Sequence, residues 1–142
     1  MPYCTQAQLE ARYGVNLLIE ISDRADVPTG AVDTDLIDQA IADADALIDG
    51  YLKARYALPL SQTPPVIGDL SRRISIYNAH ANVAGDKITR DYEQALKQLK
   101  DIASGVITLD VAGVEPASSG GNQVISNDQE RLITAASMKG YI

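Results

Sequence analysis

The side chains in this sequence that most often carry chemistry are one cysteine, one histidine and a group of aspartates. Cys4 would act as a nucleophile only if folding brought His80 against it, because a thiol needs a neighbouring base to become a thiolate at neutral pH. On a helical wheel, His80 lies beside Arg73 and Asp69 and off the apolar face of its segment, which is typical of a surface or interface histidine. We therefore expect no catalytic pair of Cys4 and His80.

Aspartates are concentrated between Asp33 and Asp49, which raises the question of a metal site. Their spacing does not follow a calcium-binding loop, which needs ligands at alternate positions, a central glycine and a final glutamate. On a helix, Asp38, Asp45 and Asp49 would instead share one strip that faces solvent or a partner protein. The sequence therefore predicts no metal and no cofactor.

Phosphate-binding patterns are also missing from the sequence. The one adjacent glycine pair, Gly120 and Gly121, is not followed by the lysine of a phosphate-binding loop, and Arg72 and Arg73 alone do not make a nucleic-acid patch. We expect that the protein is not an enzyme. An enzyme that uses Cys4 or the aspartate strip is one alternative.

The bulk composition places the chain among small globular domains. Its 142 residues suit one domain, and 46% of them are hydrophobic, although Phe and Trp are absent. The single cysteine excludes an intramolecular disulfide. Met1–Thr5 lacks the positive charge of a signal peptide, and no run approaches the roughly 20 apolar residues of a membrane helix. We expect a soluble protein made in the cytoplasm, without a membrane partner.

Charge is distributed unevenly along the chain. The net charge is −7 overall, with −8 in residues 1–50, +4 in residues 51–100 and −3 in residues 101–142. An acidic chain is a poor candidate for wrapping nucleic acid. Separated acidic and basic segments suit head-to-tail contacts between identical subunits, and the alternative is that both are simply solvated faces.

The elements that must position these residues are helices, so the predicted fold class is mainly α. Two short helices are expected at the N-terminus and three long ones after the loop at Asp23–Val32. In order they are Gln6–Arg12 after an N-cap at Thr5, Asn16–Ser22, a helix from Asp33 or Thr34 to about Tyr56, a helix from Pro65 to about Ala84, and one from an N-cap at Thr89 to Ser104.

The apolar spacing also predicts which faces are buried. In the helix that begins at Pro65, Tyr77, Ala81 and Ala84 are expected inside, whereas Ile76 and Val83 lie off that face and are expected to be exposed. Glu93 and Lys97 are expected to form a supporting i,i+4 pair, and Asp49 and Lys53 another.

Two parts with different composition follow from this pattern. Residues 1–105 are expected to form a small helical bundle, and residues 106–142 an extended C-terminal arm. Within the arm, Val106–Val111 alternates weakly and is compatible with a short strand, residues 112–123 have the Gly and Ser content of a flexible linker, and Gln129–Ser137 is compatible with a short helix.

Several segments resemble a family of Mu-like tailed phages. These are Gln8–Gly14, the stretch Ile41–Leu60, the start of a helix at Pro64-Pro65, and Tyr92–Gly105, so the resemblance covers most of residues 3–110. The family is that of the head–tail adaptor, or head-completion, proteins. The resemblance implies a structural virion protein of the neck, with a ring of about twelve copies that docks under the dodecameric portal protein, extends the DNA channel and supports the next neck or tail-completion protein. It implies assembly in the host cytoplasm and no catalytic residues.

The charge pattern and the resemblance together suggest contact surfaces. An acidic channel lining would repel DNA phosphates, which requires Asp45, Asp49 or other acids to face the channel; alternatively, these acids pair with basic residues of the next subunit. The predicted contact residues in the bundle are Asp45, Asp49, Lys53, Arg55, Leu60, Arg72 and Arg73. Those in the arm are Val124, Ile125, Leu132, Ile133 and Tyr141. A small acidic phage module that regulates another protein without forming rings is the alternative function.

Overall fold

The computed structural model describes residues 1–111, and residues 112–142 lie outside the described part. The described part contains five α-helices and no strand, which confirms the predicted mainly helical fold. In order from α1 to α5, the helices are Gln6–Tyr13, Val15–Ser22, Thr34–Leu52, Pro65–Asn78 and Asp86–Ser104. The predicted linker at 112–123 and the predicted helix Gln129–Ser137 fall outside the described residues.

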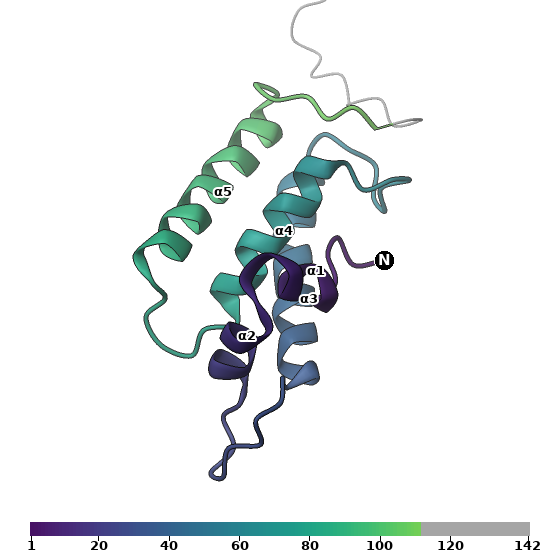
Figure 1. Cartoon of the computed structure of the whole chain (residues 1–142). Coiled ribbons are helices and arrows are strands. Elements are labelled where there is room, and N and C mark those ends of the chain that lie inside the picture. The colour runs from purple at the N-terminus through teal and green to yellow at the C-terminus, as the bar shows by residue number, and fades with distance from the viewer. Residues whose placement is uncertain (112–142) are drawn as a thin grey trace, which may run out of the picture.

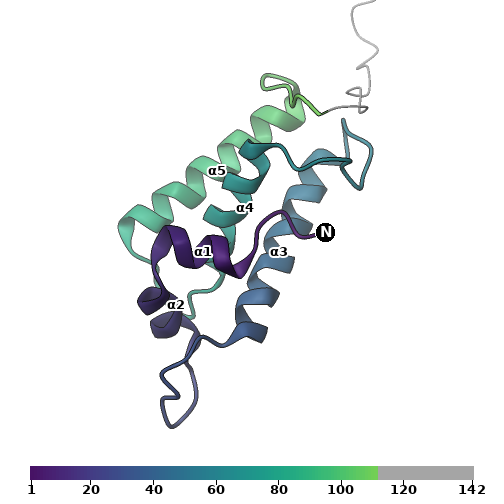
Figure 2. The same cartoon turned by 45° about the vertical axis from the view of Figure 1, so that its right-hand side comes forward.

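The three long helices form a bundle (Figure 1). Helix α4 packs against both α3 and α5, and α3 also contacts α5. The short helix α1 contacts α3 and α4, while α2 packs on α1, and the N-terminus lies beside α3 (Figure 2). No helix of residues 1–111 is long and apolar enough to cross a membrane.

Helix starts follow the predicted caps in the N-terminal half of the chain. Thr5 caps α1 with a reciprocal capping box to Gln8, and the Asp33 carboxylate accepts a hydrogen bond from the Leu36 backbone N–H at 3.2 Å. Pro65 occupies the first turn of α4, where its missing N–H costs nothing. Local sequence therefore determines where these three helices begin.

Helix α3 ends at Leu52, before the predicted end near Tyr56. The Leu52 carbonyl accepts hydrogen bonds from the backbone N–H groups of both Arg55 and Tyr56, each at 2.9 Å, so the chain closes in a tighter turn. Tyr56 nevertheless remains buried, because the turn folds back onto the core.

Helix α4 ends at Asn78, before the predicted end near Ala84. The His80 ring nitrogen Nδ1 lies 2.6 Å from the Ile76 carbonyl oxygen, and the His80 backbone N–H donates to the Tyr77 carbonyl instead. The imidazole therefore takes the place of the next helical hydrogen bond. As a result Ala81 is exposed, contrary to the prediction.

Helix α5 begins at Asp86, and not after a cap at Thr89. The Thr89 hydroxyl donates to the Ala84 carbonyl at 3.4 Å, and the Thr89 backbone N–H donates to the Gly85 carbonyl at 3.0 Å. Thr89 therefore already lies within the first turn of α5. Gly105 ends the helix with φ of 85°, in the left-handed region that favours glycine.

The core has two parts. The larger cluster joins the C-terminal half of α3 to α4 and α5, and the smaller one joins α1 and α2 to the N-terminal half of α3. Ile76 belongs to the smaller cluster and is fully buried, so its predicted exposure is wrong. Helix α4 is covered on a second side by the N-terminal region, which no single-helix wheel can show. Val83 is exposed, as predicted.

Residues 106–111 form neither helix nor strand: Val106 and Ile107 lie in a bend after α5, and residues 108–111 have no strand partner among the described residues. Leu109 and Val111 are buried in the larger cluster, whereas Val106 is exposed. The buried Tyr56 hydroxyl accepts a hydrogen bond from the Leu109 backbone N–H at 2.9 Å. The predicted alternation is thus confirmed, but no strand forms, because core side chains and one tyrosine hold the segment in place of a neighbouring strand.

Candidate interaction surfaces

The N-terminal segment is fastened to α3 by the predicted contact residues Asp45 and Asp49. The Asp45 carboxylate accepts a hydrogen bond from the Tyr3 backbone N–H at 3.0 Å and one from the Ser71 hydroxyl at 2.8 Å. The Tyr3 hydroxyl donates to Asp49. Both carboxylates therefore have partners within the chain, and neither forms an ion pair with a described basic residue.

Burial changes the acidity of this cluster. The pKa of Tyr3 is raised by desolvation first, and then by its hydrogen bond to Asp49 and by the charges of Asp49 and Asp45. The pKa of Asp45 is also raised by desolvation, although the hydrogen bonds from Tyr3 and Ser71 oppose the shift. The predicted Asp49–Lys53 pair is absent, because Asp49 accepts from Tyr3 instead. A channel-lining role for Asp45 and Asp49 stays a prediction.

Cys4 is buried between two serines of α4. The Ser71 hydroxyl lies 3.2 Å and the Ser75 hydroxyl 3.7 Å from the sulfur, and burial raises the pKa of the thiol. His80, the base that a cysteine nucleophile would need, hydrogen-bonds to the Ile76 carbonyl. Cys4 therefore has the surroundings of a core residue and not those of an activated nucleophile.

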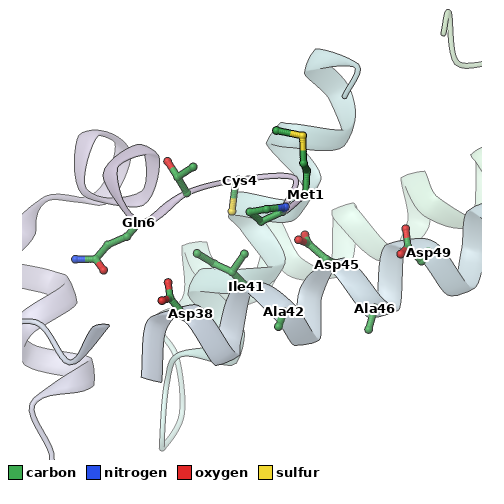
Figure 3. Close-up of a pocket in the computed structure, with 11 residues that line it drawn as sticks. Met1, Cys4, Gln6, Asp38, Ile41, Ala42, Asp45, Ala46 and Asp49 are labelled. Atoms are coloured by element: carbon green, nitrogen blue, oxygen red, sulfur yellow. The ribbon is translucent and has the colours of Figure 1, made fainter. Parts of the chain in front are cut away.

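An open groove of about 620 Å³ runs between the N-terminal segment and α3 (Figure 3). Ile41, Ala42 and Ala46 line it on the α3 side, next to carboxylates from the same helix. Asp38 and Asp49 are the carboxylates nearest its two ends along the helix. The groove is apolar at its base and acidic at its edge, which suits a basic protein surface.

Three arginines surround one aspartate on the face made by α1 and α4. Arg73 lies 2.8 Å and Arg72 3.8 Å from the Asp69 carboxylate, and Arg12 of α1 also pairs with it. The predicted contact residues Arg72 and Arg73 thus have a partner within the chain. Because one carboxylate faces three guanidinium groups, the cluster keeps an excess of positive charge. Sequence reasoning missed Arg12, which lies far from Asp69 in the sequence.

The other predicted contact residues of the bundle lie after α3. Lys53 is exposed, while Leu60 is partly buried against the larger core cluster. The guanidinium group of Arg55 lies against Gly105, where a Cβ atom would come within 2.5 Å of it. This end of the bundle also holds the start of α4 and residues 106–111 (Figure 1). The predicted arm contacts, Val124, Ile125, Leu132, Ile133 and Tyr141, lie outside the described residues.

Comparison with known proteins identifies the family. The profile of the family described as Bacteriophage Mu, Gp36 matches residues 3–127, which include all five helices. The chain belongs to the Bacteriophage Mu Gp36 family. It is 28% identical over 142 residues to gene product J of Escherichia phage Mu, covering all of both chains. It is also 28% identical over 140 residues to the Mu-like prophage FluMu protein gp36 of Haemophilus influenzae, covering 99% of this chain and 98% of that protein.

This Gp36-family chain also carries exposed charges on α3 and α5 that were not among the predicted contact residues. Asp35 and Asp38 on α3 are exposed, as are Arg90, Lys97 and Lys100 on α5. The predicted Glu93–Lys97 ion pair is not formed, whereas Lys87 pairs with Asp91 at 2.8 Å. The signal in the sequence was the heptad-like spacing of these charges, which becomes meaningful only once the outward faces are known.

Within residues 1–111, no group of three or more histidine, cysteine or acidic side chains is arranged to hold a metal ion. The polar clusters described above join elements within this Gp36-family bundle by hydrogen bonds and ion pairs. Among the exposed charges that form no ion pair within residues 1–111 are Asp35 and Asp38 of α3 and Arg90, Lys97 and Lys100 of α5.

Proposed function

We propose that this protein is a head–tail adaptor: a subunit of a ring that docks under the phage portal, extends the DNA channel and supports the next neck protein. Full-length similarity to gene product J of phage Mu supports a role in a phage. The resemblance of Ile41–Leu60 and Tyr92–Gly105 to adaptor proteins supports the specific task. In the virion the protein would lie at the head–tail interface, after assembly in the host cytoplasm.

The observation that carries the proposal is that the last described residues of the chain are packed against the bundle. Leu109 and Val111 are buried, and Leu109 is hydrogen-bonded to Tyr56, so residues 112–142 start from a fixed point at one end of the bundle. An adaptor needs a compact body for its neighbours in the ring and a segment that reaches the portal. The helical bundle would be the compact body, and the chain after residue 111 would be the segment that reaches the portal.

The charge of the chain suits a DNA channel. A net charge of −7 repels DNA phosphates, so DNA would pass without binding to the channel wall. No sequence-specific contact with DNA is required for this role. Which acids would face the channel depends on how subunits meet.

Light scattering on the purified full chain, alone and mixed with the cognate portal, tests the proposal. We expect the chain to join the portal in a fixed, ring-like stoichiometry, and we expect a chain that ends at residue 111 to remain folded but to lose portal binding. If the full chain stays apart from the portal in every oligomeric state, the adaptor role is wrong and a small regulatory module becomes the better explanation. If the shortened chain still binds, the arm is not the portal contact.

A further inference from the structure

Helices α3 and α5 present unpaired charges of opposite sign. Helix α3 carries five aspartates and no basic residue, and of these Asp35 and Asp38 are exposed without a hydrogen bond or ion pair to any described side chain. On α5, Arg90, Lys97 and Lys100 are exposed and have no ion-pair partner in residues 1–111. The buried sides of the two helices face the core, so these charges point away from it.

The charges are spaced alike on the two helices, but in opposite directions. Along α3, Asp38 follows Asp35 by three residues and Asp45 follows Asp38 by seven. Along α5 in reverse, the same steps lead from Lys100 to Lys97 and then to Arg90. With a rise of about 1.5 Å per residue, the steps are about 4.5 Å and 10.5 Å on both helices. Two antiparallel helices in this register would place Asp35 opposite Lys100 and Asp38 opposite Lys97, and would bring Arg90 to Asp45, which already accepts hydrogen bonds from Tyr3 and Ser71.

The residues between these charges fit the same register. Glu93, the acid within the basic stripe of α5, would meet Ala42 and not another carboxylate. The single like-charged match is Asp49 with Asp86, and Asp49 already accepts a hydrogen bond from Tyr3. One unfavourable position therefore stands against two pairings of free charges, Asp35 with Lys100 and Asp38 with Lys97.

The surface of α3 also has the shape to receive a helix. Ala42, Ala46 and Gly50 are exposed and follow one another at steps of four residues, so their small side chains let another helix approach closely. The groove of about 620 Å³ lies along this surface, with the N-terminal segment as its other wall (Figure 3).

We propose that the α3 groove of one copy receives the α5 face of a second copy, antiparallel, with Asp38 opposite Lys97 of that copy. This contact rests on the proposed ring and names the surfaces that would build it. Because the two faces differ, each bound pair keeps one free groove and one free α5 face, so the contact repeats and closes into a ring if the rotation allows.

The strength of such a contact depends on salt. Exposed ion pairs each contribute little, and salt screens them over about 10 Å at 0.1 M. Self-association is therefore expected to be weak for the free chain and to strengthen at low ionic strength. Assembly on a portal platform would bring neighbouring copies together and compensate for the weak contact.

Crosslinking between full-length variants that each carry one added cysteine tests the register. We mix Asp38→Cys with Lys97→Cys under mild oxidation at low salt, with native Cys4 left in its buried site and the wild-type chain as background. The expected result is a disulfide-linked pair of unlike copies, formed in preference to either like pair. The matched control replaces Asp38→Cys by Glu20→Cys, a similarly exposed position on α2. Equal yields from the two mixtures overturn the inference.

Charge reversal with rescue provides a second test. Two charge-reversed variants are compared by sedimentation velocity at low salt: Asp35→Lys/Asp38→Lys on α3 and Lys97→Glu/Lys100→Glu on α5. Each variant alone is expected to self-associate about tenfold or more weakly than the wild type. An equimolar mixture of the two variants is expected to restore the association. Glu20→Lys/Asp26→Lys makes the same change in net charge as the α3 variant, away from both faces, and should have little effect. A mixture that fails to recover contradicts the proposed pairing, as does a wild-type chain that stays monomeric.

The portal experiment separates this contact from the adaptor function. If the chain binds portal in a fixed ratio but Asp38→Cys and Lys97→Cys do not crosslink above the control, the adaptor role stands and the α3–α5 contact is wrong. If the two cysteine variants crosslink but the chain does not bind portal, the self-contact stands and the adaptor role is wrong.

Discussion

At the scale of single residues, the most informative side chain is Tyr3. It fastens the N-terminal segment to α3 through its backbone N–H, which donates to Asp45, and through its hydroxyl, which donates to Asp49. Two carboxylates four residues apart on a helix normally repel each other. Hydrogen bonds from one tyrosine offset this repulsion and hold the N-terminal segment, which lines the α3 groove, against α3.

Removing the hydroxyl of Tyr3 tests its role. Tyr3→Phe is expected to lower the free energy of unfolding by about 1 kcal/mol, because a partly buried hydrogen bond to a carboxylate is lost. Urea unfolding followed by circular dichroism measures the change. Tyr51→Phe is the matched control, since Tyr51 is also partly buried on the core but makes no described hydrogen bond through its hydroxyl. Equal losses in the two variants would show that the Asp49 contact contributes nothing.

At the scale of elements, two glycines with different backbone conformations affect helix stability in opposite ways. Gly50 lies inside α3 with helical geometry and nothing within 4 Å of the position of a Cβ atom. Gly105 ends α5 with φ of 85° and lies against the Arg55 guanidinium group. Alanine should therefore have opposite effects at the two positions.

We expect Gly50→Ala to raise the free energy of unfolding by about 0.5–1 kcal/mol, because glycine has more backbone freedom to lose in a helix. Gly105→Ala should lower it by about 1–2 kcal/mol, because alanine is strained in the left-handed region and its Cβ would displace Arg55. Thermal unfolding of both variants beside the wild type measures the two shifts. A loss at position 50, or no change at position 105, would contradict this account.

At the scale of the whole molecule, the bundle is closed by residues beyond its last helix. Leu109 and Val111 fill the larger core cluster, so the segment 106–111 packs as part of the bundle although it was predicted as the start of the arm. The domain boundary at residue 105 stays a prediction, and truncation can test it.

We expect a chain that ends at residue 111 to unfold cooperatively with nearly the stability of the full chain. A chain that ends at residue 104 should lose about 2–5 kcal/mol or fail to fold, since it lacks two buried side chains and leaves the Tyr56 hydroxyl without its donor from Leu109. Urea unfolding of the two truncated chains decides between them. Equal stability would place the boundary at the end of α5.

The sequence by itself determined the elements of this protein, because caps and apolar spacing act within one helix. Thr5, Asp33 and Pro65 begin helices where the local pattern predicts, and Gly105 ends one. The mainly helical fold and the alternation of residues 106–111 were readable for the same reason. Segments such as Ile41–Leu60 also sufficed to indicate a Mu-like phage family.

Only the tertiary structure decided which residues meet across the chain. Ile76 is buried because α1 and α2 cover a second side of α4, and α4 ends early because the His80 ring binds a carbonyl of the helix. Asp45 binds Tyr3, whereas Asp35 and Asp38 of α3 and Lys97 and Lys100 of α5 have no ion-pair partner in residues 1–111. Burial and pairing depend on elements far apart in sequence, so no pattern within one helix could assign them.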